Sequence, residues 1–242
     1  YESQNRVTDA RVEREMKDRL EVQSIYSLKG GGRHVFRRLN LDYRLGYSYA
    51  NEDEPNRQDM TFVQKKIDFI YNIANPNFPT FDATNGKDLF DPQAYQFDDL
   101  VVENNKTTDK NVTAKVNMEV PFQWHQSPGM FRFGGKIRRK RKERKNDVLV
   151  LDRYNGNLTM ADVVGNFEDT EFLGDRYQIG KSPDPDKVEA FYSTNQANFE
   201  QDINSSREDT DPANYDATGN VYAAYAQARL NLGDWMVLLG GR

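Results

Sequence analysis

The sequence predicts an all-β fold, namely a segment of an antiparallel transmembrane β-barrel with about six long strands, short periplasmic turns and two long extracellular loops. Apolar and polar residues alternate over runs of about twelve residues, which is the period of a strand and not of a helix. The connections between these runs are short inside hairpins and long between them. The chain is 37% hydrophobic and 12% aromatic, with a mean hydropathy of −0.89, which argues against one large conventional core.

The first predicted hairpin contains "RLNLDYRLGYSYA", in which apolar or aromatic residues alternate without a break with polar or small ones. The segment before it alternates less strictly and places five residues on one face: Met16, Leu20, Val22, Tyr26 and Leu28. Between the two runs lies "KGGGRH", whose glycines at 30–32 would supply the positive φ of a tight turn. We therefore expect a long β-hairpin that turns at these glycines.

Two further hairpins follow the same rhythm. "NVTAKVNMEVPF" leads through the short connection "QWHQSPG" into "MFRFGGKIRRK", and "VYAAYAQARLNL" leads through "NLGDW" into "MVLLGGR". The long connections would be extracellular loops at about 51–109 and 143–218, so that residues 1–242 form part of a single barrel domain. Trp124 and Trp235 fall near strand ends, where interfacial aromatic residues gather in membrane barrels. A soluble β-sandwich is the alternative, although its strands are usually half as long.

The stretch "KIRRKRKERK" at 136–145 could indicate nucleic-acid binding, but the net charge of −5 argues against a nucleic-acid partner. In strand phase, Phe131, Phe133 and Ile137 face one way. The basic residues Arg132, Lys136, Arg138 and Lys140 face the other, toward a lumen or rim. Basic residues further along would then emerge at the outer rim, where they could attract an anionic solute or meet lipopolysaccharide phosphates; these are Arg139, Arg141, Lys142, Arg144 and Lys145. A solvated strand end balanced by acidic loops is the alternative interpretation.

No motif supports catalysis, so we expect no enzyme, no catalytic residue, no metal site and no cofactor. The chain has no cysteine, and its two histidines fall in predicted turns. "GKS" at 180–182 resembles the end of a phosphate-binding loop but lacks the glycine five residues earlier. The acidic residues near 184 and 209–216 are expected to be solvated loop residues, because an EF-hand glycine and terminal glutamate are missing.

"YDATGNVYAAYAQARLNLGDWMVLLGGR" and "VPFQWHQSPGMFRFGGKIRRK" resemble barrel hairpins of the TonB-dependent outer-membrane receptors, as does "RVEREMKDRLEVQSIYSLKGGGRH" with the strand after it. The resemblance implies a Gram-negative outer-membrane receptor that takes up a scarce solute or metal chelate of the siderophore, vitamin or oligosaccharide class. It also implies coupling to TonB through a plug domain that these residues do not include. We expect the chain to be an internal piece of a longer protein that does not fold alone in plain buffer, since its edge strands would be open.

Solute contacts are expected from loop aromatic and amide residues. The candidates are Tyr71, Phe78, Phe81, Tyr95, Tyr154, Asn166, Phe167, Tyr177, Tyr192 and Asn195. A helix is predicted in "SPDPDKVEAFYSTNQANFEQD", with Val188, Phe191, Tyr192 and Phe199 along one face. Two other functions remain open: a soluble extracellular glycan-binding β-domain, which would use the same aromatic residues, and a plain diffusion porin, which would lack a plug.

Overall fold

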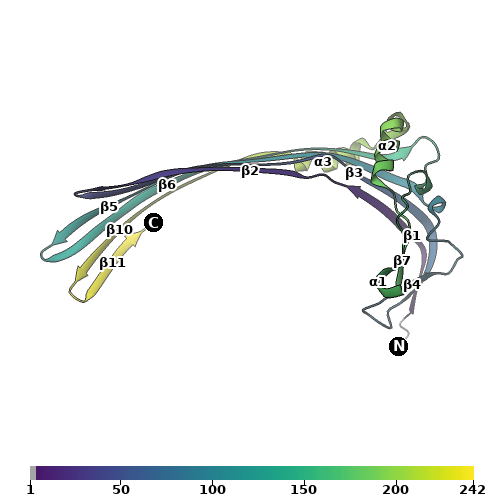
Figure 1. Cartoon of the computed structure of the whole chain (residues 1–242), viewed down its shortest axis with the longest axis horizontal. Coiled ribbons are helices and arrows are strands. Elements are labelled where there is room, and N and C mark those ends of the chain that lie inside the picture. The colour runs from purple at the N-terminus through teal and green to yellow at the C-terminus, as the bar shows by residue number, and fades with distance from the viewer. Residues whose placement is uncertain (1–3) are drawn as a thin grey trace. The chain divides into compact units, whose positions relative to one another are not determined.

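The structure is a computed structural model that describes residues 4–242 (Figure 1). It consists mostly of antiparallel β-sheet with few helices, which confirms the all-β prediction. The sheet strands are β1 (Gln4–Asp18), β2 (Val22–Phe36), β3 (Leu39–Asn72), β4 (Thr80–Ala83), β5 (Gln96–Trp124), β6 (Ser127–Tyr154), β9 (Phe199–Gln201), β10 (Tyr215–Leu232) and β11 (Trp235–Gly241). A two-stranded sheet joins β7 (Asp169–Glu171) and β8 (Tyr177–Ile179).

The helical elements are short. They are α1 (Phe172–Asp175), α2 (Pro185–Asn195), α3 (Ile203–Thr210) and the 3-10 turns η1 (Pro92–Ala94), η2 (Met160–Asp162), η3 (Gln196–Asn198) and η4 (Asp211–Ala213). The predicted helix is therefore present as α2. Asp184 caps its first turn by accepting a hydrogen bond from the Lys187 backbone N–H, and Pro185 occupies the first helical position, where its missing N–H is not needed.

The main sheet has the strand order β1-β3-β5-β6-β10-β11, with β2 paired to the other half of β3. Within residues 4–242 the order ends at β1 and β2 on one side and at β11 on the other, so the sheet is open and no closed barrel is formed. Strands β3, β5 and β6 are 34, 29 and 28 residues long. They extend far into the predicted loops at 51–109 and 143–218, so the irregular connections are reduced to about 73–95 and 155–214.

The turns are short, as predicted, but the first turn does not lie where the sequence predicts it. The glycines at 30–32 lie inside β2, paired with Leu45, Arg44 and Tyr43, and the chain reverses at residues 37–38. The second turn lies at residues 125–126 and the third at 233–234. Two of the turn residues, His125 and Gly233, have positive φ values of 54° and 60°.

The chain divides into two compact units. Unit 1 comprises the residues up to Leu20 together with Glu54–Asn104 and Asn146–Pro212, and unit 2 comprises Glu21–Asp53, Asn105–Lys145 and Ala213–Arg242. The longest strands contribute one stretch to each unit. The two units differ in how far their apolar residues are buried.

Unit 1 has a hydrophobic core between the sheet and the loop segments. Phe62, Tyr95, Val163 and Val188 are completely buried there, together with Met60, Leu100 and Met160. Phe199 closes the cluster with edge-on ring contacts to Phe97, Tyr154 and Tyr192. The face of α2 predicted from its spacing thus packs against the core.

Helix α3 protects the edge of β6 beyond the point where β10 stops pairing. The last β6–β10 pair is Arg144 with Tyr215. Further along β6, the Val148 N–H donates to the Thr210 hydroxyl and the Val150 N–H donates to the Ser206 hydroxyl, each at 2.9 Å. The two hydroxyl groups act as the hydrogen-bond acceptors that a neighbouring strand would otherwise supply, because unpaired strand N–H groups must find acceptors when water is excluded.

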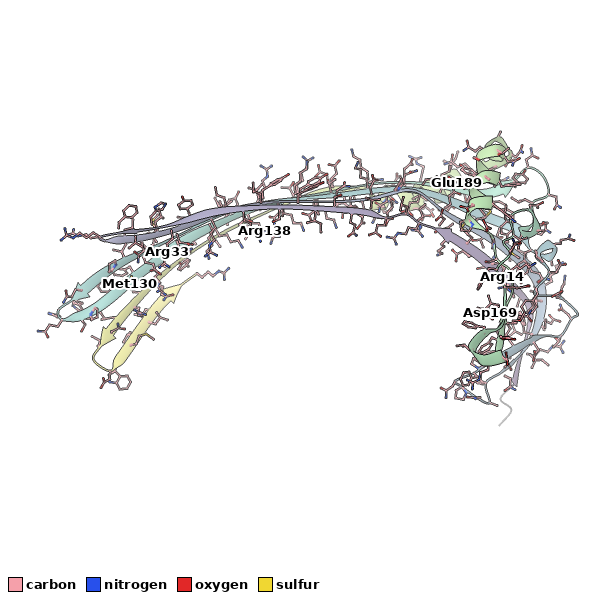
Figure 2. All side chains as sticks on the ribbon, in the orientation of Figure 1. Arg14, Arg33, Met130, Arg138, Asp169 and Glu189 are labelled. Carbon is pink, nitrogen blue, oxygen red and sulfur yellow. The ribbon has the colours of Figure 1, made fainter. Side chains whose placement is uncertain are left out.

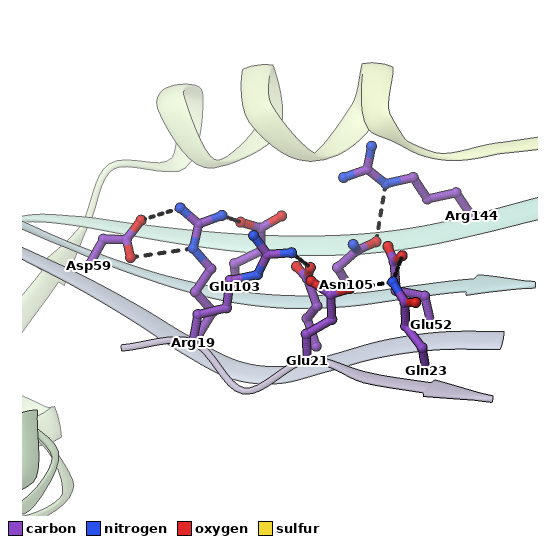
Figure 3. A network of polar contacts seen from close by, with 10 residues as sticks. Arg19, Glu21, Gln23, Glu52, Asp59, Glu103, Asn105 and Arg144 are labelled. Atoms are coloured by element: carbon purple, nitrogen blue, oxygen red, sulfur yellow. Dashed lines mark hydrogen bonds and ion pairs between the residues drawn. The ribbon is translucent and has the colours of Figure 1, made fainter. Parts of the chain in front are cut away.

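Charged side chains in both units have polar partners on the same strand or on a neighbouring one (Figure 3). In unit 1, the Arg57 guanidinium contacts the Asp59 carboxylate at 2.5 Å and the Glu103 carboxylate at 3.1 Å. The hydrogen bond that the Arg57 guanidinium donates to the Asp59 carboxylate raises the pKa of Arg57. In unit 2, the Arg144 Nε donates to the Asn105 side chain at 3.1 Å.

Unit 2 is a single-layer sheet whose side chains stand off both faces (Figure 2). One face carries the alternating apolar residues, which we call the apolar band: Leu39, Leu41, Tyr43, Leu45, Tyr47 and Tyr49 of β3; Val112, Ala114, Val116, Met118, Val120 and Phe122 of β5; Phe131, Phe133 and Ile137 of β6; and Tyr222, Ala224, Ala226, Ala228, Leu230 and Leu232 of β10. The opposite side is called the polar face.

The apolar band is not covered. Leu45 is 61% exposed, Ile137 53% and Tyr222 72%, and Asn105 is the only buried residue of unit 2, all of whose residues are described. The alternating residues therefore do not point into a compact interior, as they would in a sandwich. Uncovered apolar surface of this extent is rare on a soluble monomer and marks contact with lipid or with another protein.

Candidate ligand-binding surfaces

Two concave surfaces, one in each unit, are the candidates for ligand binding. The first, called the loop concavity, lies in unit 1 and has a volume of about 430 Å³. Three segments far apart in the sequence line it: Thr80, Phe81, Asp82 and Ala83; Lys87, Asp88, Leu89 and Phe90; and Arg176, Tyr177 and Gln178.

Local pairing positions the aromatic residues of the loop concavity. Strand β4 folds back on β3, which places Phe81 beside Tyr71 in the pair register and its ring edge-on to Phe69 at 5.8 Å. The Tyr177 hydroxyl donates to the Pro79 carbonyl at 3.0 Å, which ties the two long connections together. The Arg176 guanidinium lies 3.7 Å from the centroid of the Phe78 ring, a cation–π contact.

The floor is fixed by contacts to the core. The Tyr95 hydroxyl donates to the Leu89 carbonyl at 2.7 Å, and an Arg14 guanidinium N–H donates to the same carbonyl at 3.4 Å. Gly180 lies against the Phe90 ring, because a Cβ at this position would approach ring carbon Cδ1 to 2.6 Å. The glycine of "GKS" thus admits an aromatic ring, and no helix begins at 180–182 as a phosphate-binding loop requires.

The loop concavity combines exposed ring surface with charged groups of both signs. Phe81 is 56% and Phe90 40% exposed. Lys87 and Arg176 supply cationic donors, while Asp82 and Asp88 supply acceptors. Ring faces with a few polar groups around them suit a small amphipathic solute.

The structure brings together some of the predicted solute-contacting residues and separates others. Phe81 and Tyr177 line the loop concavity, while Tyr71 and Phe78 lie directly behind them. Asn166 and Phe167 are exposed in a different segment, Phe167 at 68%.

Four of the predicted contacts take part in packing or hydrogen bonding within unit 1. Tyr95 is completely buried, and Tyr154 and Tyr192 pack against the core. Burial raises the pKa of Tyr192 above its usual value. The Asn195 side chain donates to the Phe191 carbonyl at 2.9 Å within α2. These four residues do not line the loop concavity, since a loop aromatic residue in a sequence could equally belong to the core of the loops.

Sequence reasoning missed Lys87, Phe90 and Arg176 as residues of the loop concavity. Phe90 carries no periodic signal, and Arg176 follows a short turn, α1, in which Leu173 and Gly174 have positive φ. The contact between Arg176 and Phe78 joins positions in two different connections. Only the tertiary fold creates that contact.

The second surface is the polar face of unit 2. Arg132, Lys136, Arg138 and Lys140 share it, as predicted, because their β10 partners Gln227, Ala223, Val221 and Gly219 alternate with the partners of Phe131, Phe133 and Ile137. The basic run at 136–145 is not a strand end, however. It occupies the middle of β6, which continues to Tyr154.

Most cations of the predicted basic set have partners. The Lys140 ammonium lies 2.7 Å from the Asp109 carboxylate, and the Arg132 Nε lies 2.9 Å from the Glu119 carboxylate. The Arg138 Nε donates to the Asn111 amide oxygen at 3.1 Å. Lys136 alone among the four lacks an ion pair or hydrogen bond in the described part of the chain.

The acidic residues considered as metal ligands have other roles. Asp184 caps α2, and Asp216 forms a two-pronged pair with Arg141 at 2.9 and 2.5 Å, which lowers the pKa of Asp216. Within residues 4–242 no three His, Cys, Asp or Glu side chains gather closely enough to hold a metal ion. Among the same residues, no helix has the length and apolar character to cross a membrane.

No protein-family model matches this chain, and no curated protein matches it either.

Proposed function

We propose that the chain is a wall segment of a Gram-negative outer-membrane β-barrel receptor that takes up a scarce solute. The single observation that carries the proposal is the uncovered apolar band of unit 2. From Leu39 to Tyr49 the alternation runs over about eleven residues, or roughly 35 Å of strand at about 3.3 Å per residue. Tilted by about 45°, such a strand spans an apolar layer of about 25 Å, the height of the lipid-facing band in membrane barrels.

The borders of the band support the same assignment. Tyr26 and Tyr49 pair across β2 and β3 at one border, and Tyr222 of β10 pairs with Ile137, the last band residue of β6. Trp124 and Trp235 stand at the turns at the other border, 57% and 79% exposed. Tyrosine and tryptophan favour both membrane–water interfaces because their rings are apolar at one end and polar at the other.

The polar face and the loops complete the proposal. A lumen-facing surface of a barrel is polar, and long connections at one end of the strands build a binding surface. The loop concavity would contact the solute, and the resemblance to TonB-dependent receptors suggests coupling to TonB through a plug. Solute uptake of this kind and coupling to TonB would place the chain in the outer membrane, next to lipid and lipopolysaccharide.

Tryptophan emission tests the membrane assignment, because both tryptophans of the chain lie at one border of the band. The chain is refolded into neutral phosphatidylcholine vesicles, and the emission maximum and the quenching by brominated lipids are compared with those in plain buffer. We expect a blue shift and strong quenching with lipids brominated near the headgroup. Single Trp124→Phe and Trp235→Phe variants assign each signal and serve as matched controls.

Two outcomes would decide against the proposal. A chain that is monodisperse in plain buffer, unfolds cooperatively there and shows no change in tryptophan emission with vesicles would favour the soluble glycan-binding domain. Membrane insertion of the complete protein, with solute flux that needs no energy coupling, would instead favour a plain diffusion porin.

A further inference from the structure

The polar face of unit 2 contains a cluster of cations without partners, which we call the cation cluster: Lys29 and Arg33 of β2, Lys115 of β5 and Lys136 of β6. All four side chains are exposed, and no carboxylate of the described residues lies within ion-pair distance of any of them. Other cations on the same face do have partners, such as Lys140 with Asp109 at 2.7 Å. The cluster is therefore a local excess of positive charge in a chain of net charge −5.

The cluster surrounds a concavity of about 730 Å³ that the backbone itself creates. Lys29 pairs with Gly46 and Gly31 pairs with Arg44 across β2 and β3, and Ser27 pairs with Ser48 beside them. These small residues leave a depression between long cationic side chains. A Cβ on Gly31 would collide with the Tyr43 carbonyl, so this part of the floor must remain a glycine.

A second concavity of about 790 Å³ adjoins the first along Lys115 and Lys136, which line both. Its other wall includes Tyr225 and Gln227 of β10 and the Arg242 residue after β11. The cations thus extend over β2, β3, β5 and β6, a width of about 14 Å at about 4.8 Å per strand. Each concavity has the size of a typical small-molecule site.

The only carboxylate lining the first concavity, Asp42, is already engaged. Its oxygens lie 3.6 Å from the Arg44 Nε and accept a hydrogen bond from the Asn117 amide at 3.1 Å. Asp42 also lies opposite Arg33 in the register of β2 and β3. One carboxylate is thus set against five lining cations, namely Arg44 and the four of the cluster, which leaves an excess of positive charge. Cations gathered in a concave surface concentrate the field and draw in anions.

From this geometry we infer that the cation cluster binds a small solute carrying two or more anionic groups. Identifying that solute as the transported one rests on the proposed function, whereas the binding itself does not. The width of the cluster suits a molecule whose anionic groups contact lysines on β2, β5 and β6 at once. Ring and amide groups of Tyr225 and Gln227 are available for the remainder of the solute.

Inorganic tripolyphosphate is a suitable probe, and the 242-residue chain in zwitterionic micelles is the sample. Titration calorimetry compares the wild type with a Lys29→Gln/Lys115→Gln/Lys136→Gln variant. A control variant, Lys106→Gln/Lys110→Gln/Arg139→Gln, removes the same charge from the opposite face of the same unit. We expect the first variant to weaken binding by more than about tenfold and the control by less than about twofold. Raising the salt concentration should weaken wild-type binding, because exposed charges are screened.

A measurement without substitutions guards against misfolded variants. Reductive methylation of the wild-type lysines, read by mass spectrometry, should be slowed by tripolyphosphate at Lys29, Lys115 and Lys136. Methylation of Lys106 and Lys110 should be unchanged. Equal protection of all five lysines, or equal loss of binding in the two variants, would overturn the inference. So would the absence of tripolyphosphate binding in a sample that binds an acidic peptide or single-stranded DNA.

The two proposals can fail separately. If tryptophan emission is unchanged by lipid while tripolyphosphate protects the cluster lysines from methylation, the membrane assignment fails and the anion site stands. If the chain inserts into vesicles and tripolyphosphate protects no lysine, the anion site fails and the membrane assignment stands.

Discussion

Replacing Leu45 by arginine gives the sharpest prediction about the apolar band. Leu45 lies near the middle of the band on β3 and is 61% exposed in the structure. If the band faces water, Leu45→Arg should change the free energy of unfolding by no more than about 0.5 kcal/mol, as for other surface substitutions. If the band faces hydrocarbon, an arginine near the bilayer midplane should cost about 2–4 kcal/mol.

The control for this prediction is Ser48→Arg, which adds the same side chain to the same strand but on the polar face. Ser48 pairs with Ser27 on β2, so the longer side chain has room. We expect this control to cost less than about 1 kcal/mol. The assay is reversible urea unfolding of the chain in phosphatidylcholine vesicles, followed by tryptophan emission.

The difference between the two variants decides the question, since each carries one extra positive charge. At about 1.4 kcal/mol per factor of ten, the expected gap of at least about 1 kcal/mol lowers the folded-to-unfolded ratio of Leu45→Arg by at least about five-fold relative to the control. Equal stabilities for Leu45→Arg and Ser48→Arg in vesicles would refute the lipid-facing assignment of the band.

Three further predictions concern other parts of the chain. Phe62→Ala should destabilise unit 1 by about 3–5 kcal/mol in denaturant unfolding, because the ring is completely buried, whereas Phe167→Ala, at a 68% exposed ring, should be nearly neutral. Gly134→Ala should lower the thermal unfolding temperature, because its Cβ would approach the backbone carbonyl of a neighbouring strand to 2.5 Å; Gly219→Ala, with open space around it, should not. Asp99 lies outside the band, and burial is the main cause that raises its pKa. The folded state therefore binds the proton of Asp99 more tightly than the unfolded state does. The free energy of unfolding falls as the pH rises from the pKa of Asp99 in the unfolded state to its pKa in the folded state. Asp99→Asn should therefore unfold at higher denaturant than wild type at pH 7 and lose this advantage near pH 3; an unchanged difference across that pH range would contradict the burial argument.

The candidate sites were only partly visible in the sequence. The phase of "FRFGGKIRRK" places the basic residues on one face, and the register of β6 with β10 confirms it. Which of those cations lack partners depends on neighbouring strands, and Lys29 and Lys115 come from β2 and β5. The sequence indicates that loop aromatic residues are important, but it does not show which of them are buried and which are exposed. Tyr95 and Phe81, for example, are both aromatic residues in predicted loops. Burial separates them, at 0% and 56% exposure.

The sequence alone determined the strand period, the three hairpins, the opposite faces of unit 2 and the helix at 185–195, because these depend on neighbours within a few residues along the chain. It placed the first turn wrongly at the glycines, because positive φ at glycine is permitted but not required. Only the tertiary structure decided the strand lengths, the division into a cored unit and a single-layer unit, and the residues of the three concavities. These features depend on contacts between strands and loops that lie far apart along the chain.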